Sequence, residues 1–213
     1  MRHLPALPVS GGRLLDVGFG GGAFLITAKS MGWNVVGVDA DPEVIKNARS
    51  LGLAAYEGGV EVLTGMDGSF DVITMSHVIE HLADPLAAIH RSYALLKSGG
   101  QIWIETPNID SLGHLRFGRH WRGLEAPRHL VLFSSESLER ALLHAGFVRV
   151  KHVSQGKPFG FMYYQSDRIR RGLSPYGRSF KGSFAQLEIA MGNAFELLFC
   201  SRREFVSLMA IKE

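Results

Sequence analysis

A glycine-rich stretch near the start of the chain could bind a ligand through its backbone. It reads Asp16-Val17-Gly18-Phe19-Gly20-Gly21-Gly22 and follows a short apolar run. The run predicts a buried strand that ends in a tight turn, with a helix beginning directly after it. Glycine suits such a turn because it tolerates positive φ values and lets a ligand approach the backbone N–H groups. We therefore take this stretch as a candidate ligand-binding loop.

Two acids near this loop indicate which ligand it suits. Gly18-x-Gly20-x-x-Ala23 satisfies the dinucleotide fingerprint, and Asp39 lies at the spacing expected of a ribose-binding acid. An NAD(P)-dependent oxidoreductase is therefore a real alternative. Asp16 argues against it, because a carboxylate at the mouth of the loop would repel a pyrophosphate and favour a cationic ligand. The loop suits a ligand that carries a ribose and a positive charge but no phosphates.

A second group of reactive side chains lies in residues 114–133, which are rich in Arg and His. This segment follows an apolar stretch at 101–106, and ligands of open α/β sheets bind beyond the carboxyl ends of strands. His129 is our first choice for a general base because imidazole titrates near neutrality, and His77 or His81 is our second. Anchoring of the segment to the sheet by His129 is an equally open interpretation.

Charge is distributed unevenly along the chain. Residues 119–213 carry 15 Lys/Arg and 8 Asp/Glu, whereas residues 1–118 carry 8 and 12. Arg119, Arg122 and Arg128 could clamp a carboxylate or a phosphate. The basic half could face an anionic substrate, a nucleic acid, a membrane surface or simply solvent.

The segment His77-Val78-Ile79-Glu80-His81 matches the H-x-x-E-H pattern of one class of zinc protease. Asp84-Pro85 follows after two residues and leaves barely two helical turns. We therefore expect no protease helix here and assign no metal ligand, while the need for a divalent cation stays open. The simplest role for Glu80 and His81 is a mutual hydrogen bond that holds the loop.

Alternating apolar runs, helix caps and glycine or proline stops must position these residues. With 213 residues the chain can form one domain with a sizeable core. The alternation predicts an α/β protein with a parallel sheet covered on both faces. Residues 109–133 are expected to be irregular, and residues 154–182 to form a mobile loop or lid. Strands are expected at 13–17, 34–38, 53–56, 70–75, 101–106, 147–153 and 204–211, and helices at 21–31, 41–50, 85–97, 134–145 and 184–199.

Four linked segments together resemble the motifs of class I S-adenosylmethionine-dependent methyltransferases, in the small-molecule branch with type 11, 12 or 23 domains. They are Asp16 to Gly22, Val38-Asp39, Phe70 to Leu82, and Leu95-Leu96-Lys97-Ser98-Gly99-Gly100. The resemblance implies a Rossmann-like, seven-stranded, mostly parallel sheet with a reversed last strand and helices on both faces. It also implies a single methyltransferase domain over 1–213, with a basic insertion or lid at about 154–203 between strands six and seven.

The family implies a position for each motif residue. The methionine moiety would lie near Asp16 and the loop residues Gly18, Phe19, Gly20 and Gly22. Asp39 and Ala40 would hold the ribose. The adenine would pack on Gly58, Gly59 and Val60, where relatives often have an acid or a polar residue. Ser76 and His77 would border cofactor and acceptor. The acceptor itself would contact Trp121, Arg119, Arg128 and His129.

The resemblance implies methyl transfer from S-adenosylmethionine to an oxygen, or as second choice a nitrogen, of a small-molecule or glycan- or lipid-linked acceptor. The acceptor could be anionic. An RNA methyltransferase or nucleic-acid-binding protein is disfavoured, because no Asn/Asp-Pro-Pro-Tyr type motif follows the fourth strand. The single cysteine and the lack of a signal peptide or membrane span predict a cytoplasmic protein. Aromatic and Arg residues at 158–171 leave room for peripheral membrane contact.

Overall fold

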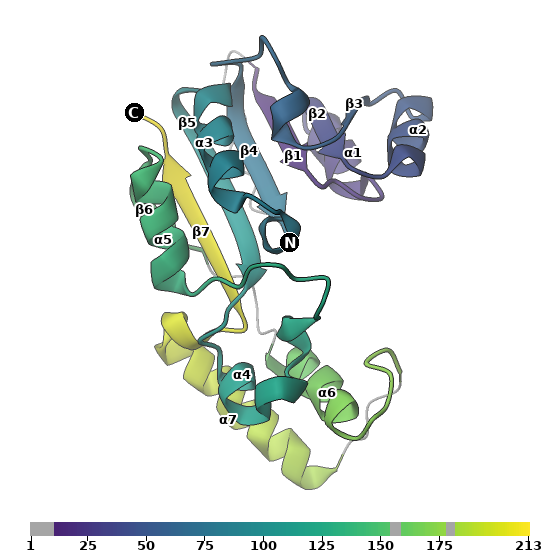
Figure 1. Cartoon of the computed structure of the whole chain (residues 1–213), viewed down its shortest axis with the longest axis vertical. Coiled ribbons are helices and arrows are strands. Elements are labelled where there is room, and N and C mark those ends of the chain that lie inside the picture. Colours follow the sequence, from purple (N-terminus) through teal and green to yellow (C-terminus); the bar gives the residue numbers. More distant parts are fainter. Residues whose placement is uncertain (1–10, 154–158, 178–181) are drawn as a thin grey trace.

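The computed structural model describes residues 11–153, 159–177 and 182–213. Its core is one seven-stranded sheet with the order β3-β2-β1-β4-β5-β7-β6 (Figure 1). β7 runs antiparallel to both of its neighbours, and the pairings among β1 to β5 are parallel. The predicted sheet with a reversed last strand is confirmed. The strands are β1 (Arg13–Val17), β2 (Asn34–Asp39), β3 (Ala54–Glu57), β4 (Phe70–Ser76), β5 (Leu96–Pro107), β6 (Val148–His152) and β7 (Phe205–Ile211).

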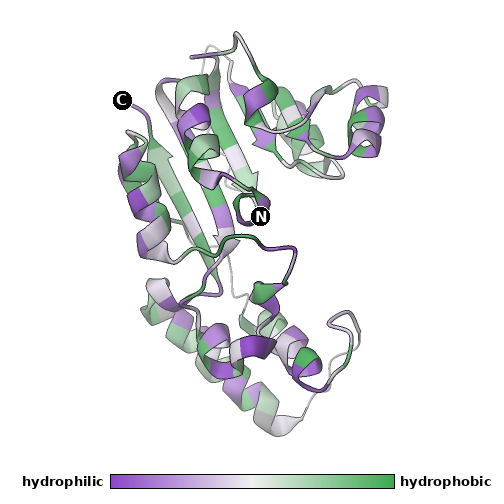
Figure 2. Ribbon diagram, viewed as in Figure 1, coloured by the Kyte–Doolittle hydropathy of each residue, from purple (hydrophilic) through white to green (hydrophobic). Residues whose placement is uncertain are grey.

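Helices cover both faces of this sheet because alternate strand residues point to opposite sides. Leu15 and Val17 of β1 belong to a core that also contains residues of α3 (Pro85–Leu95) and α5 (Ser135–His144). Leu14, on the other face, packs with residues of α1 (Ala23–Ser30) and α2 (Pro42–Ser50). The inner strands β1, β2 and β4 are accordingly rich in apolar residues (Figure 2). The predicted two-sided arrangement is confirmed.

A third group of helices lies beyond the end of the sheet toward which β4 and β5 run (Figure 1). It comprises α4 (Leu112–Phe117), α6 (Phe159–Arg170) and α7 (Ser183–Leu198), with two short 3₁₀ turns, η3 (Gly118–His120) and η4 (Arg122–Leu124). Its core contains Phe117, Trp121, Phe159, Met162 and Tyr163. We call this group the helical cap. It lies at the edge of the sheet where an α/β protein binds its ligands.

The structure corrects the expectation for two segments of the cap. Residues 154–182 are not simply a loop, because α6 occupies 159–170; residues 154–158 and 178–181 lie outside the described part. Phe159, Met162 and Tyr163 are spaced as one face of a helix and are buried, which outweighs the glycines around them. Residues 109–133 likewise contain α4, which Ser111 caps by accepting a hydrogen bond from the His114 N–H.

Across the described ranges, none of the helices is both long enough and apolar enough to cross a lipid bilayer.

Candidate functional site

The loop after β1 is shaped by its contact with β2. Gly18 N–H donates to the Val38 carbonyl at 2.8 Å, and Gly20 N–H donates to Oδ2 of Asp39 at 2.9 Å. Gly20 has φ +56°, and a Cβ placed on Gly20 or Gly21 would meet nothing within 4 Å. The loop therefore leaves open space in front of its backbone, beside an acid at the end of the next strand. This is the arrangement that a ribose-containing cofactor requires.

Asp16 lies deeper than the sequence indicates. Its side chain is fully buried within β1, and the Thr74 hydroxyl on β4 donates to its Oδ1 at 2.7 Å. It therefore ties β1 to β4 directly beneath the loop. Its contact with the methionine moiety stays a prediction, as do those of Phe19, which is buried, and Gly22.

The segment after β3 lies beside the end of β2 and carries an exposed acid, Glu61. Gly58 N–H donates to the Asp39 carbonyl at 2.9 Å, which places the segment beside the end of β2. Val60 is buried, whereas the exposed Glu61 accepts a hydrogen bond from the Gly59 N–H at 2.8 Å. The sequence interpretation missed Glu61, although it follows the three predicted adenine-packing residues directly.

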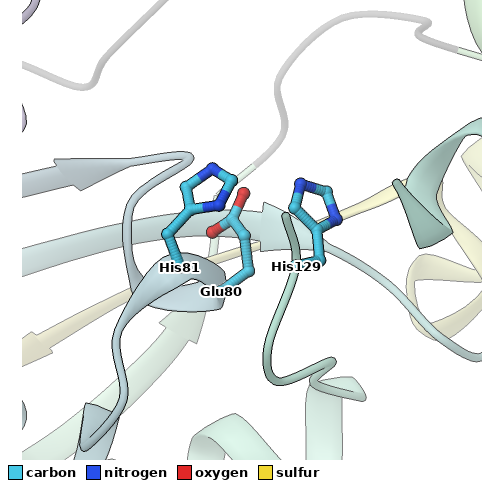
Figure 3. Close-up of side chains that lie close together, drawn as sticks. All are labelled: Glu80, His81 and His129. Atoms are coloured by element: carbon cyan, nitrogen blue, oxygen red, sulfur yellow. The ribbon is translucent and has the colours of Figure 1, made fainter. Parts of the chain in front are cut away.

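All three predicted catalytic histidines line one cavity of about 240 Å³ between the sheet end and the helical cap. His77 and His81 follow β4, and His129 comes from the segment after η4. The rings of His81 and His129 lie 4.9 Å apart (Figure 3). Other residues that line the cavity are Glu80, Pro107, Arg122, Gly123, Glu125, Arg128, Phe161, Met162, Gln165, Tyr176 and Phe205.

Backbone carbonyls fix the orientation of two of these imidazoles. His81 Nδ1 lies 3.0 Å from the Arg128 carbonyl oxygen, and His129 Nδ1 lies 2.7 Å from that of Gly123. A carbonyl oxygen only accepts hydrogen bonds, so each Nδ1 carries the proton and each Nε2 keeps its lone pair in the neutral ring. In both neutral imidazoles, Nε2 can therefore accept a proton or bind a metal ion, but it cannot donate a hydrogen bond.

The segment that contains His129 is anchored by its backbone. The N–H groups of Leu130 and Val131 both donate to the Glu80 carbonyl, at 2.8 and 3.2 Å. The expected bond between Glu80 and His81 is replaced by others. The Thr106 hydroxyl donates to Glu80 Oε2 at 2.9 Å, and His77 Nδ1 lies 3.3 Å from Oε1. Anchoring is therefore done by the peptide backbone around His129.

Glu80 is a fully buried acid at the floor of the cavity. Burial, the largest influence, raises its pKa. The hydrogen bond and positive charge of His77, with bonds from the Glu80 backbone and from Thr106, more than offset burial, so the pKa lies below its ordinary value. Glu80 is therefore ionised at neutral pH.

His77 holds an unusual backbone position at the end of β4. Its φ is +55°, a left-handed conformation that is rare for a residue other than glycine. The ring lies between two acids, with Nε2 3.6 Å from Glu105 Oε1, and contacts Phe205 edge-on at 4.8 Å. Such strain is commonly held at functional sites by the surrounding contacts.

Glu125 is a second acid of the cavity that the sequence interpretation missed. Its carboxylate contacts Arg122 Nη1 at 2.6 Å, Arg128 Nη1 at 3.2 Å and His129 Nε2 at 3.5 Å. Burial raises the pKa of Glu125, but Arg122 above all, then Arg128 and His129, bring it below its ordinary value. An anionic ligand would therefore compete with Glu125 for both arginines.

The structure brings only some of the other residues predicted to contact the acceptor to the cavity. Arg128 lines the cavity, whereas Arg119 is exposed on η3 and is not among the lining residues. Trp121 is 1% exposed, and its Nε1–H donates to Glu204 Oε2 at 2.8 Å. Its ring packs so closely on Gly123 that a Cβ there would collide with it. The structure thus gives Trp121 a packing position beneath the His129 segment.

Within the described ranges, Glu80, His81 and His129 form a group that could hold a metal ion, with candidate ligand atoms within 4.8 Å of one another (Figure 3). The Nδ1–H bonds to backbone carbonyls are also the second-sphere contacts common for metal-binding histidines. The sequence-based assignment of no metal ligand stays a prediction.

A family comparison decides how this site is to be interpreted. The sequence model described as a methyltransferase domain matches residues 2–152, which is more than half of the chain. The chain belongs to the methyltransferase-domain family. This family segment contains the glycine loop, Asp39 and the three cavity histidines. The predicted family is confirmed, and the oxidoreductase and nucleic-acid-binding alternatives are not favoured.

The relatives and solved structures agree with this assignment. A ubiquinone biosynthesis O-methyltransferase of Xanthomonas euvesicatoria pv. vesicatoria is 37% identical over 112 residues, which cover 48% of this chain and 46% of that protein. The matched part is thus less than half the length of the curated relative. A SAM-dependent methyltransferase of Archaeoglobus fulgidus shares the fold, with 23% identity, a TM-score of 0.64, and coverage of 95% of this chain and 86% of the other.

A phosphoethanolamine N-methyltransferase 2 of Haemonchus contortus, solved with S-adenosyl-L-methionine, also shares the fold. It is 20% identical with a TM-score of 0.65, and the match covers 98% of this chain and 50% of that one. The fold and the cofactor class predicted from the sequence are consistent with both structures.

Asp39 gives a direct test of the cofactor loop of this methyltransferase domain. Changing Asp39→Asn is expected to weaken binding of S-adenosylhomocysteine roughly 10- to 100-fold, because hydrogen bonds to a charged acceptor are lost. Isothermal titration calorimetry measures the change. Asp41→Asn is the matched control, since Asp41 only caps α2 and Asn caps equally well. Equal affinities of the two variants would contradict the ribose-binding role.

Proposed function

We propose that this methyltransferase domain transfers a methyl group from S-adenosylmethionine to a hydroxyl oxygen of a small, amphiphilic acceptor bound in the cavity. The observation that carries the proposal is the orientation of His129. Its Nδ1 is engaged by the Gly123 carbonyl, its ring lines the cavity, and burial dominates the shift that takes its pKa below the ordinary value. A neutral base is thus available beside the bound acceptor at pH 7.

The cofactor would lie along the loop from Gly18 to Gly22, with its ribose on Asp39 and its adenine near Gly58 to Val60 and Glu61. The open space at Gly20 and Gly21 supports this placement. When bound, S-adenosylmethionine supplies an electrophilic methyl group on a positively charged sulfur. Ser76 and His77, at the end of β4, would then border the methyl group and the acceptor.

The residues of the cavity have simple tasks in this reaction. His129 Nε2 would take the proton of the acceptor hydroxyl as that oxygen receives the methyl group, which bound S-adenosylmethionine would supply. The ionised Glu80 and Glu125 stabilise the resulting imidazolium. The enzyme otherwise acts by positioning the two reactants in line.

The lining of the cavity supports an aromatic or otherwise amphiphilic acceptor. Phe161, Met162 and Phe205 add apolar and aromatic lining to the cavity. Arg128 has a side chain that is 68% exposed and could meet an acidic group of the acceptor. The O-methyltransferase named among the relatives supports oxygen rather than nitrogen as the acceptor atom. A lipid-linked acceptor and a cytoplasmic location remain part of the proposal.

The proposal is tested by incubating the protein with S-adenosylmethionine and a panel of catechols, aliphatic alcohols and amines. Formation of S-adenosylhomocysteine and of the methylated product is followed by mass spectrometry. We expect turnover with catechols, and binding of S-adenosylhomocysteine but not of NAD(H) in calorimetry. Exclusive methylation of the amines, or tight binding of NAD(H) alone, would overturn it.

A further inference from the structure

One face of helix α7 packs against the rest of the helical cap. Ile189 packs against α6 at Gly160, and Gly192 lies so close to the Phe159 ring that a Cβ would collide with it. Glu196 is buried and accepts a hydrogen bond from the Glu204 N–H at 2.8 Å. Glu188 pairs with Arg116 and Tyr163. Both acids of α7 therefore lie on the face that packs against the rest of the cap.

The opposite face of α7 is apolar and exposed. Leu187 is 58% exposed, Met191 64%, Phe195 39% and Leu198 77%, and Phe199, directly after the helix, is 49% exposed. The spacing of 187, 191, 195 and 198 places them along one stripe of the helix. We call these five residues the α7 outer face. The other exposed side chains of α7 that the structure describes are Ser183, Gln186, Ala190 and Ala194, so the face carries no charge.

The same stripe continues into a groove of about 280 Å³. Met191 and Phe195 line it together with Leu112, Phe159 and Tyr163. Apolar residues recur along α7 in Figure 2 as well. An exposed apolar surface of this extent is unusual for a protein that contacts only water.

The helical cap carries a net positive charge. The described residues of 109–133 and 154–203, which include the cap, carry 9 Lys/Arg and 5 Asp/Glu, whereas the rest of the described chain carries 10 and 15. Arg202 and Arg203 follow the end of α7 within four residues of Phe199 and donate to the carbonyls of Asp110 and Glu196. An apolar stripe on a cationic body is complementary to an anionic surface.

We propose that the α7 outer face docks on an anionic lipid surface, with its apolar side chains in the acyl boundary and the cationic cap above the headgroups. A second copy of the chain fits less well, because docking through this face would bring two cationic caps together. A protein partner fits less well because, among the described exposed side chains of α7, Ser183 and Gln186 alone are polar and could form the hydrogen bonds that protein interfaces carry. The proposal is independent of the methyl-transfer reaction.

This surface differs from the one that the sequence indicated. The sequence indicates the aromatic and Arg residues at 158–171 for peripheral membrane contact, but Phe159 and Tyr163 are buried in the cap. Phe161 is exposed but lines the cavity. We therefore place the proposed contact on α7 rather than on α6.

Co-sedimentation with vesicles tests the proposal. We expect the protein to pellet with vesicles of 70% phosphatidylcholine and 30% phosphatidylglycerol, and not with phosphatidylcholine alone. The double variant Met191→Glu/Leu198→Glu is expected to lower the bound fraction at least tenfold. Leu143→Glu, on α5 and 50% exposed, is the matched control and should bind like the wild type.

A second measurement uses the wild-type sequence, so it does not depend on whether a variant folds. Cys200 is exposed and directly follows Phe199, and it is the one cysteine of the chain. An environment-sensitive fluorophore on Cys200 should shift to the blue with anionic vesicles only. Lack of pelleting and of a shift would overturn the proposal. So would a dimer in light scattering that the double variant abolishes while vesicle binding is unchanged.

Discussion

Replacing His129 with Asn is expected to lower kcat/KM for methyl transfer by about 100- to 10,000-fold, the range that a positioned general base usually contributes. Asn can still donate to the Gly123 carbonyl, which His129 Nδ1 contacts at 2.7 Å, and the backbone bonds that anchor the segment are untouched. What is lost is the Nε2 lone pair at the cavity. Affinity for S-adenosylhomocysteine should be unchanged, because the cofactor loop lies elsewhere.

The pH dependence separates a base from a packing residue. Burial, as the largest influence, lowers the pKa of His129, and the Gly123 carbonyl, Glu80 and Glu125 raise it without cancelling the effect. The imidazole must be neutral to accept a proton, so kcat/KM should fall only when the pH drops below about 6.5. The Asn variant should lose this acidic limb. His152→Asn, on the exposed edge strand β6, is the matched control.

Two outcomes would contradict this role. A variant with wild-type kcat/KM would remove His129 from the proton transfer. Loss of activity that Mg²⁺ or Zn²⁺ restores in the wild type after EDTA treatment, but not in the variant, would assign His129 with Glu80 and His81 to a metal site. Melting temperatures within a few degrees of the wild type show that the fold is kept.

The sheet could be predicted from the sequence because its signals are local. Apolar runs that end at Asp16, Asp39 and Ser76 mark strands that stop at one edge, and Asp41-Pro42 and Asp84-Pro85 mark the starts of helices. The structure confirms the Asp41 and Asp84 caps through bonds to the N–H groups of Glu43 and Ala87. Such patterns depend on neighbours within a few residues, so one sequence suffices to see them.

The cavity could be predicted only in part, because its pairings join distant residues. His77 meets Glu105 on the next strand, and Trp121 meets Glu204 across 83 positions. Helix α6 was missed since its glycine and its polar residues resemble a loop until Phe159, Met162 and Tyr163 are seen packed on α7. Glu125 was missed for the same reason: its importance comes from its contacts with Arg122, Arg128 and His129 rather than from a motif.

The second large effect that we expect is on stability, and it comes from Glu204. The side chain is fully buried between β7 and the cap, and it accepts hydrogen bonds from Gly113 N–H at 2.6 Å and Trp121 Nε1–H at 2.8 Å. Burial, the largest influence, and the nearby Glu196 raise the pKa of Glu204 to about 7, against the lowering effect of the two hydrogen bonds. The folded protein therefore holds a proton here that the unfolded chain releases near pH 4.5.

The sign of the effect follows from this difference in proton binding. Between pH 4.5 and 7 the folded state binds more protons, so the free energy of unfolding falls as the pH rises. At about 1.4 kcal/mol for each unit of pKa difference, this one group removes roughly 3 kcal/mol of stability by pH 8. Urea denaturation from pH 4.5 to 8 measures it.

Glu204→Gln should flatten this slope, since an amide does not titrate. It should also lower stability at pH 5 by roughly 1 kcal/mol, because the amide nitrogen cannot accept from one of the two N–H donors. Glu136→Gln, on the exposed first turn of α5, is the control and should keep the wild-type slope. An unchanged slope in Glu204→Gln would assign the titration to Glu196, whose pKa burial also raises. Glu204 joins β7 to Gly113 on α4 and to Trp121 beneath the His129 segment. Protonation of Glu204 is therefore also expected to affect how firmly the cap holds His129.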